Sequence, residues 1–192
     1  MHILFVTQYF SPEIGAASER LTGLAFNLSK LGYKVTVITG FPNYPFGKVY
    51  LGYTKKLFSL ENNNGVKVIR VWLFTTDNTK PVARLFSYLT FMFSAILTGL
   101  RTESADYIVA TSGPLFTALA GYVVSAIKRV PFIFDVRDIW PERIYAGTNM
   151  KRGTLIKTLE KIEIFLYKKA ARIIAVTNGV KNNIISKGII AE

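Results

Sequence analysis

The densest group of charged side chains in the sequence follows a short apolar run, residues 132–136, which is typical of a buried strand. Asp135, Arg137 and Asp138 stand at the end of this run. Charged side chains at the end of a buried strand destabilise the fold unless each has an ion-pair partner, so they are otherwise kept for binding or catalysis. One interpretation is a structural ion pair, either Asp135 with Arg137 or Asp138 with Arg143. The other is that these charges belong to a functional site. We favour the site, because ligands bind beyond the carboxyl ends of parallel strands.

A second candidate site lies between the first predicted strand, residues 3–9, and the helix that begins at Ala16. Gly15 allows a close turn of the backbone there, and N–H groups at the start of a helix attract anions such as phosphate. A tight turn that binds nothing fits the same residues. The loop lacks both the Walker spacing and the three-glycine dinucleotide fingerprint, and the second strand ends in Thr39 rather than an acid. A nicotinamide-dependent oxidoreductase is therefore disfavoured.

Residues 41–53 interleave aromatic rings with amide, hydroxyl and lysine groups. Rings that stack on a sugar and cations that meet phosphate would use this mixture, and a long loop in a compact domain is often functional. The alternative is that these rings close a cluster over the edge of the sheet. The candidates for substrate binding in this loop are Asn43, Tyr44, Lys48 and Tyr50.

The composition excludes several classes of chemistry. The 192 residues include no cysteine and a single histidine, His2, which excludes disulfides, thiolate or histidine metal clusters and Ser-His-Asp catalysis. The 24 Lys and Arg against 12 Asp and Glu give a net charge of +12, which favours anionic partners. Because the basic residues are scattered and match no nucleic-acid motif, we expect no nucleic-acid partner.

Hydrophobic periodicity predicts strands that alternate with helices along the chain. The predicted strands are residues 3–9, 35–39, 66–74, 107–111, 132–136 and 172–176. The predicted helices are residues 16–31, 81–101, 115–128, 154–171 and 181–186. Residues 41–65 are predicted as a long loop that ends in a hairpin-like turn. The alternation predicts a single α/β domain, a Rossmann-like and mostly parallel sheet with helices on both faces.

Two uncharged apolar stretches, residues 85–100 and 113–127, fall short of the roughly 20 residues that a transmembrane helix requires. We expect both to form helices that pack against the sheet, although the first is apolar almost all round and could also contact a bilayer surface. The basic face of the predicted helix 154–171 has two interpretations. It is either an ordinary solvent-exposed face or a face that lies on anionic lipid. Its basic residues are Lys157, Lys161, Lys168 and Lys169. No targeting segment is expected, because Pro12 ends the first apolar run early.

Three stretches resemble the GT-B glycosyltransferases of family 4 and follow the family order: residues 6–17 (VTQYFSPEIGAA), 39–48 (TGFPNYPFGK) and 134–142 (FDVRDIWPE). The subgroup that they resemble most is the fucosaminyltransferase-like enzymes of bacterial O-antigen and capsule assembly. That family has two Rossmann-like domains, an N-terminal one that mainly binds acceptor and a C-terminal one that mainly binds nucleotide sugar. The resemblance places residues 1–192 in the N-terminal domain. The donor-binding domain, with its two glutamates that have seven residues between them, is expected to be absent from this chain.

The resemblance implies a retaining reaction without metal or cofactor, in which the acceptor hydroxyl attacks on the face from which the nucleotide diphosphate leaves. Gly15 and Ala16 would bring backbone N–H groups to the donor diphosphate. Arg137 stands where many members have histidine, and Asp138 keeps the family aspartate, so these two are the predicted catalytic residues. The predicted acceptor-binding residues are Asn43, Tyr44, Lys48, Tyr50 and Glu142.

The resemblance also implies substrates and a location. The donor would be a nucleotide sugar and the acceptor a polyprenyl-diphosphate-linked glycan in bacterial surface polysaccharide synthesis. We expect a cytoplasmic protein with peripheral contact to the anionic inner face of the cytoplasmic membrane, and no transfer by residues 1–192 alone. The alternative is a stand-alone Rossmann-like module that binds a glycan lipid or phosphate without catalysis.

Overall fold

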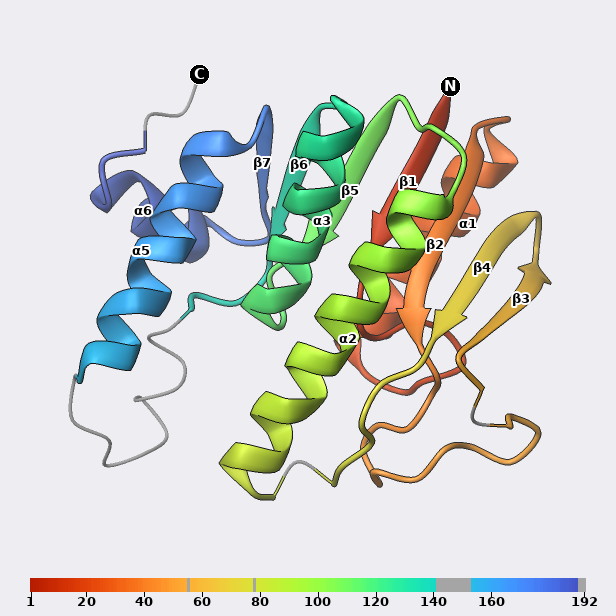
Figure 1. Cartoon of the computed structure of the whole chain (residues 1–192). Helices are drawn as coiled ribbons and strands as arrows, with labels where there is room; N and C mark the ends of the chain where they lie inside the picture. The colour runs from red at the N-terminus through yellow and green to blue at the C-terminus, as the bar shows by residue number, and fades with distance from the viewer. Residues whose placement is uncertain (55, 78, 141–152, 190–192) are drawn as a thin grey trace.

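The computed structural model describes residues 1–54, 56–77, 79–140 and 153–189. Its described residues form a seven-stranded sheet with the order β3-β4-β2-β1-β5-β6-β7 (Figure 1). The strands are β1 (His2–Val6), β2 (Lys34–Gly40), β3 (Phe58–Asn63), β4 (Val66–Val71), β5 (Tyr107–Thr111), β6 (Phe132–Val136) and β7 (Arg172–Ala175). Every pairing is parallel except β3 with β4. This confirms the predicted α/β, Rossmann-like fold.

Helices cover both faces of the sheet. They are α1 (Ala16–Lys30), α2 (Pro81–Arg101), α3 (Leu115–Lys128), α5 (Thr154–Lys169) and α6 (Asn178–Ser186). One buried apolar cluster joins the sheet to α2, α3 and α5, and a second joins the opposite face to α1. Figure 1 shows α2, α3 and α5 side by side in front of the sheet and α1 behind it. Because the central strands are buried on both faces, they read as continuous apolar runs in the sequence.

The prediction that residues 41–65 form one loop is wrong, because β3 occupies Phe58–Asn63. This strand pairs with β4 through a two-residue turn at Asn64 and Gly65, whose φ values of 50° and 80° fit a type I′ hairpin. Its side chains alternate between exposed and half-buried, and the apolar residues Phe58 and Leu60 lie on the exposed side. The apolar alternation ends at Leu60, and residues 62–65 (NNNG) resemble a turn, so the sequence did not mark this strand. Its backbone pairing with β4 at the edge of the sheet forms it.

Helix α2 packs against the sheet, as predicted, and also against α3. Gly99 lies so close to α3 that a Cβ atom there would approach Val124 Cγ2 to 2.7 Å. The helix nevertheless has 21 residues, and only 28% of its most apolar window is buried. By length and composition it is the one helix in the described residues that could cross a membrane, a criterion that a core helix also meets.

The C-terminal helix begins earlier than predicted. Thr177 Oγ1 accepts a hydrogen bond from the N–H of Val180, 3.2 Å away, which is the usual N-cap arrangement. Helix α6 therefore begins at Asn178 rather than at Lys181. The cap explains why a helix can start on a segment of asparagine, glycine and valine that has weak helical propensity.

Candidate functional site

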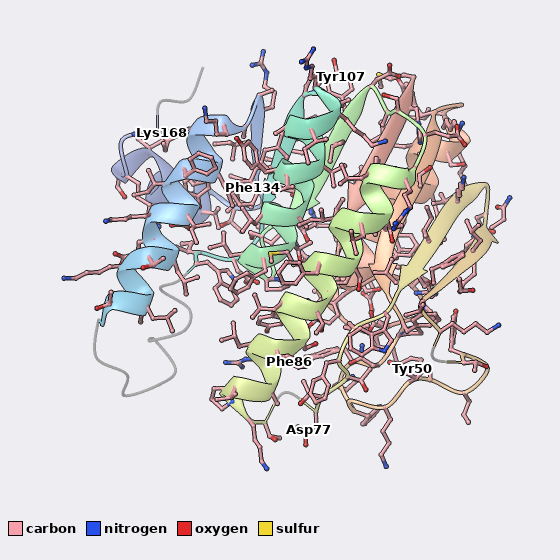
Figure 2. All side chains as sticks on the ribbon, viewed as in Figure 1. Tyr50, Asp77, Phe86, Tyr107, Phe134 and Lys168 are labelled. Carbon is pink, nitrogen blue, oxygen red and sulfur yellow. The ribbon has the colours of Figure 1, made fainter. Side chains whose placement is uncertain are left out.

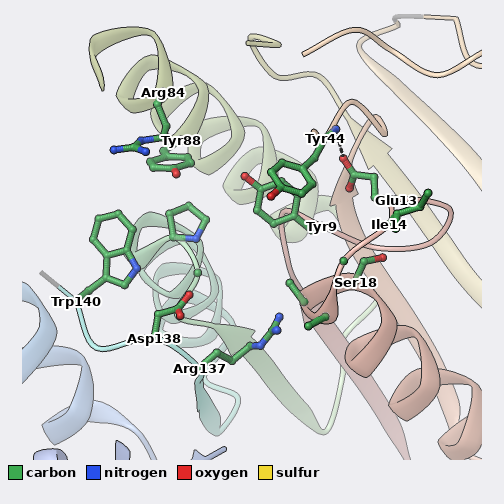
Figure 3. Close-up of a pocket in the computed structure, with 15 residues that line it drawn as sticks. Tyr9, Glu13, Ile14, Ser18, Tyr44, Arg84, Tyr88, Arg137, Asp138 and Trp140 are labelled. Carbon is green, nitrogen blue, oxygen red and sulfur yellow. Dashed lines mark hydrogen bonds between the residues drawn. The ribbon is translucent and has the colours of Figure 1, made fainter. Parts of the chain in front are cut away.

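A cavity of about 510 Å³ opens at the carboxyl edge of the sheet. Five separate parts of the chain line it. They are the loop from β1 into α1, Tyr44 of the 41–53 loop, Arg84 and Tyr88 of α2, the end of β5 with Gly113 and Pro114, and the end of β6 with Arg137, Asp138 and Trp140. Figure 3 shows Arg137 and Asp138 on one side of this cavity and Tyr9, Tyr44 and Glu13 on the other. The predicted residues Gly15, Ala16, Tyr44, Arg137 and Asp138 therefore lie on one rim.

The first turn of α1 forms one wall of the cavity. Gly15 is its N-cap with φ of +147°, a conformation that side chains other than that of glycine rarely adopt. Gly15, Ala16, Ala17 and Ser18 all line the cavity, and no side chain of the described residues caps this turn. The first N–H groups of a helix have no acceptor within it and carry the positive end of its dipole. This wall is therefore suited to bind an anion such as a diphosphate.

The turn after β6 carries Arg137 and Asp138 on the facing wall, and Ser112 holds it in place. Ser112 Oγ accepts hydrogen bonds from the N–H groups of Arg137 (2.7 Å) and Asp138 (3.1 Å) and donates to the Asp138 carbonyl oxygen (3.3 Å). A Cβ atom on Gly113 would lie 3.2 Å from Asp138 Oδ2, so glycine leaves room for the carboxylate. The end of β5 thus fixes the direction of the two predicted catalytic side chains.

Asp135 belongs to the scaffold rather than to the cavity. Its carboxylate accepts two hydrogen bonds from Arg20 of α1, at 2.6 and 2.9 Å, and only 1% of its side chain is exposed. The ion pair of Asp135 with Arg137 considered from the sequence is therefore wrong. A partner 115 residues away in sequence could not be inferred from local spacing. The other considered pair involves Arg143, which lies outside the described residues.

Glu13 connects two loops of the site. Its Oε1 accepts hydrogen bonds from the N–H groups of Asn43 and Tyr44, both at 2.9 Å, and its Oε2 accepts a longer one from Phe10, at 3.4 Å. Burial raises the pKa of this carboxyl from 4.5 to about 7, although the three N–H groups and the Arg70 charge act in the opposite direction. Glu13 was not singled out from the sequence, because its buried position depends on a loop 30 residues further along.

Of the acceptor-binding candidates in the 41–53 loop, Tyr44 alone lines the cavity. Tyr44 lines it and packs edge to face with Tyr9, with ring centroids 5.4 Å apart. Asn43 is buried, and its side-chain amide donates to the Phe41 carbonyl at 2.9 Å. Tyr50 donates its hydroxyl to the Tyr44 carbonyl at 2.6 Å, so it supports the loop from outside.

Two other acceptor candidates are not placed at the cavity. Lys48 is exposed and does not line it. Glu142 lies outside the described residues. The binding roles of both remain predictions.

Besides Glu13, the cavity residues that were not singled out from the sequence include Arg84, Tyr88 and Trp140. Arg84 and Tyr88 belong to α2, which was interpreted only as a packing helix, and Trp140 follows the charged turn. The Trp140 ring is 9% exposed and packs edge to face with Tyr88, with centroids 6.1 Å apart. Its Nε1–H has no hydrogen-bond acceptor among the described residues. A buried donor in a cavity is a natural partner for a substrate oxygen.

A mostly parallel sheet with a helix N-terminus and charged strand ends at its carboxyl edge defines a Rossmann-like α/β domain, in which ligands bind at that edge. The chain belongs to the family of glycosyl transferase 4-like domains, whose model matches residues 15–192. This confirms the predicted family at the level of a glycosyl transferase 4-like domain, and the fucosaminyltransferase-like subgroup stays a prediction. Among the described residues, no group of three or more metal-ligating side chains comes together.

A solved structure shows the same fold. Sucrose-phosphate synthase from Thermosynechococcus elongatus is similar, with a TM-score of 0.65 at 12% sequence identity. The similarity covers 98% of this chain and 45% of that structure, so the chain spans less than half of its length. No curated protein sequence matches the chain.

Proposed function

We propose that this chain is the N-terminal, acceptor-side domain of a retaining glycosyltransferase of the fucosaminyltransferase-like subgroup. The enzyme would transfer a sugar from a nucleotide sugar to a lipid-linked glycan during bacterial surface polysaccharide synthesis. A second Rossmann-like domain that binds the nucleotide would close the cavity from the other side. The observation that carries the proposal is the single cavity in which the α1 N-terminus faces Arg137 and Asp138.

The chemistry follows from the two walls. The acceptor oxygen bonds to the anomeric carbon on the face from which the diphosphate departs, the bond from that carbon to the diphosphate oxygen breaks, and the hydroxyl proton passes to the departing phosphate. Negative charge grows on the diphosphate during this step. The N–H groups of Gly15 and Ala16 and the guanidinium of Arg137 would stabilise that charge, which is electrostatic catalysis. The Asp138 carboxylate would accept hydrogen bonds from sugar hydroxyls.

Other residues that line the cavity fit the acceptor. Tyr9, Tyr44 and Tyr88 offer rings on which sugars stack, and Trp140 offers a hydrogen-bond donor. Arg84 adds a cation for an acceptor diphosphate. The substrate is then a polyprenyl-diphosphate-linked glycan, with no metal, cofactor or nucleic acid involved. The protein would act in the cytoplasm, against the inner face of the cytoplasmic membrane.

The experiment is the Asp138→Asn substitution in the enzyme that contains this domain, assayed with nucleotide sugar and a polyprenyl-diphosphate-linked acceptor. We expect kcat to fall by about 100-fold or more, with little change in protein stability. Asp77→Asn is the matched control, because Asp77 is exposed in the loop before α2. Unchanged turnover by the Asp138 variant would remove this residue from the mechanism. Absence of any transfer by the unmodified enzyme would favour the binding module without catalysis.

A further inference from the structure

The outer side of α2 is apolar, which is unusual for a helix that covers a sheet. Val82, Phe86, Phe93 and Leu97 share this side, and their exposed fractions are 80, 51, 60 and 55%. The inner side of the same helix is also apolar, with Phe91 among its fully buried residues. A covering helix ordinarily has a polar outer side, so α2 has an apolar face that nothing in the described chain covers.

Helix α3 lies on the same face of the sheet as α2 (Figure 1). It packs beside α2 and exposes Ile127 to 61%. Neither α2 nor α3 contains an aspartate or a glutamate. Two adjacent helices therefore present apolar side chains and no negative charge on the same face of the sheet.

Helix α5 borders this surface on the other side of α3 and supplies positive charge. Phe165 of α5 packs edge to face with Tyr122 of α3, with ring centroids 5.1 Å apart, and is itself 41% exposed. Around it stand four exposed lysines, Lys157, Lys161, Lys168 and Lys169. Figure 2 shows Phe86 on α2 and Lys168 on α5. Apolar side chains flanked by lysines on one face match a membrane interface, where acyl chains lie below anionic headgroups.

We propose that the face formed by α2, α3 and α5 docks on an anionic lipid bilayer, with the outer side of α2 inserted and the α5 lysines on the headgroups. A second copy of the chain would bring its own net charge of +12 to this positive face, so charge complementarity favours lipid. The inference rests on the membrane contact of the proposed function and assigns it a surface. Because Arg84 and Tyr88 of the same helix line the cavity, docking places the cavity mouth beside the headgroups.

Membrane docking is tested by labelling single cysteines. Because residues 1–192 contain no cysteine, each introduced cysteine is labelled alone. Phe93→Cys and Leu31→Cys are labelled with an environment-sensitive NBD dye; Leu31 ends α1 on the opposite face and is 73% exposed. Vesicles contain phosphatidylcholine alone or with 30% phosphatidylglycerol. We expect the dye at position 93 to shift to the blue on anionic vesicles and to be quenched by bromine in the acyl chains. The dye at position 31 should show neither response.

The contribution of charge is tested by reversal. Lys161→Glu with Lys168→Glu should weaken binding to anionic vesicles by more than about tenfold. Lys30→Glu with Lys56→Glu, on α1 and before β3, changes the net charge equally and should weaken it far less. Equal losses in the two pairs, or a blue shift at position 93 that needs no vesicles and accompanies dimer formation in sedimentation, would overturn the proposal. Since vesicle binding is measured without sugar transfer, a failure of the proposed catalysis leaves this result intact.

Discussion

Replacing Glu13 with glutamine tests whether burial or hydrogen bonding controls the carboxyl that joins two loops of the site. Glutamine keeps an oxygen that can accept from the N–H groups of Asn43 and Tyr44, but it cannot ionise. The variant therefore removes the titration while it keeps most of the geometry. Any difference from the wild type that depends on pH then comes from the ionisation of Glu13.

The sign and size of the effect follow from the raised pKa. Burial holds the pKa of Glu13 at about 7 in the folded chain, against 4.5 for an exposed glutamate. Between these values the folded chain binds more protons than the unfolded chain, so its stability falls as the pH rises. The contribution of Glu13 is fully present below about pH 4.5 and is lost as the pH passes 7. The complete loss corresponds to about 3 kcal/mol, most of which falls between pH 5 and pH 8.

The assay is urea denaturation of the wild type and Glu13→Gln at pH 5, 6, 7 and 8. We expect the wild type to lose about 2–3 kcal/mol relative to the variant over this range. Glu103→Gln is the matched control. Glu103 is exposed, and its ion pairs with Lys34 and Lys67 lower its pKa. The difference in unfolding free energy between this variant and the wild type should therefore not change between pH 5 and pH 8. A flat difference for Glu13→Gln as well would mean that the loop N–H groups keep the carboxylate ionised, and would refute the argument from burial.

Three further predictions concern the scaffold of the site, each measured as the free energy of unfolding. Arg20→Met should cost about 3 kcal/mol because it leaves Asp135 buried without its partner, and adding Asp135→Leu to it should recover part of that loss. Gly15→Ala should cost about 1–3 kcal/mol through strain at φ of +147°, whereas Gly23→Ala, inside α1 with nothing within 4 Å of its Cβ position, should stabilise by about 0.5–1 kcal/mol. Thr177→Ala should cost about 1 kcal/mol by removing the cap of α6, and an unchanged stability would show that the cap is replaced by water.

The fold could be predicted from the sequence because apolar residues follow different patterns in its central strands and in its helices. Residues 107–111 and 132–136 are mostly apolar because both faces of these strands are largely buried, and both strands were placed correctly. Strand β3 was missed because Glu61, Asn62 and Asn63 carry no apolar signal and their pairing depends on β4. Local patterns record burial well, but they do not record backbone pairing at the edge of a sheet.

The site was predictable only where it lies at the end of a strand. Gly15, Arg137 and Asp138 could be found because the carboxyl ends of parallel strands meet at one edge. Arg84 could not be found, since its position depends on how far α2 extends past that edge. Asn43 has the residue type of a ligand-binding side chain, yet its amide is used within its own loop. Residue type gave the candidates, and only tertiary contacts decided between them.

Helix α2 connects the proposed sugar transfer with the proposed membrane docking, because one side of it lines the cavity and the outer side belongs to the docking face. Its inner side is held against α3 by the close contact of Gly99 with Val124, so the helix has little freedom to rotate or slide. Arg84 and Tyr88 therefore keep a fixed height relative to Phe93 on the outer side. If the outer side is inserted in a bilayer, this rigid packing sets the distance between the cavity and the headgroups. An acceptor whose diphosphate sits at the headgroup level would then meet Arg84 without leaving the membrane, whereas a soluble glycan would gain nothing from this arrangement.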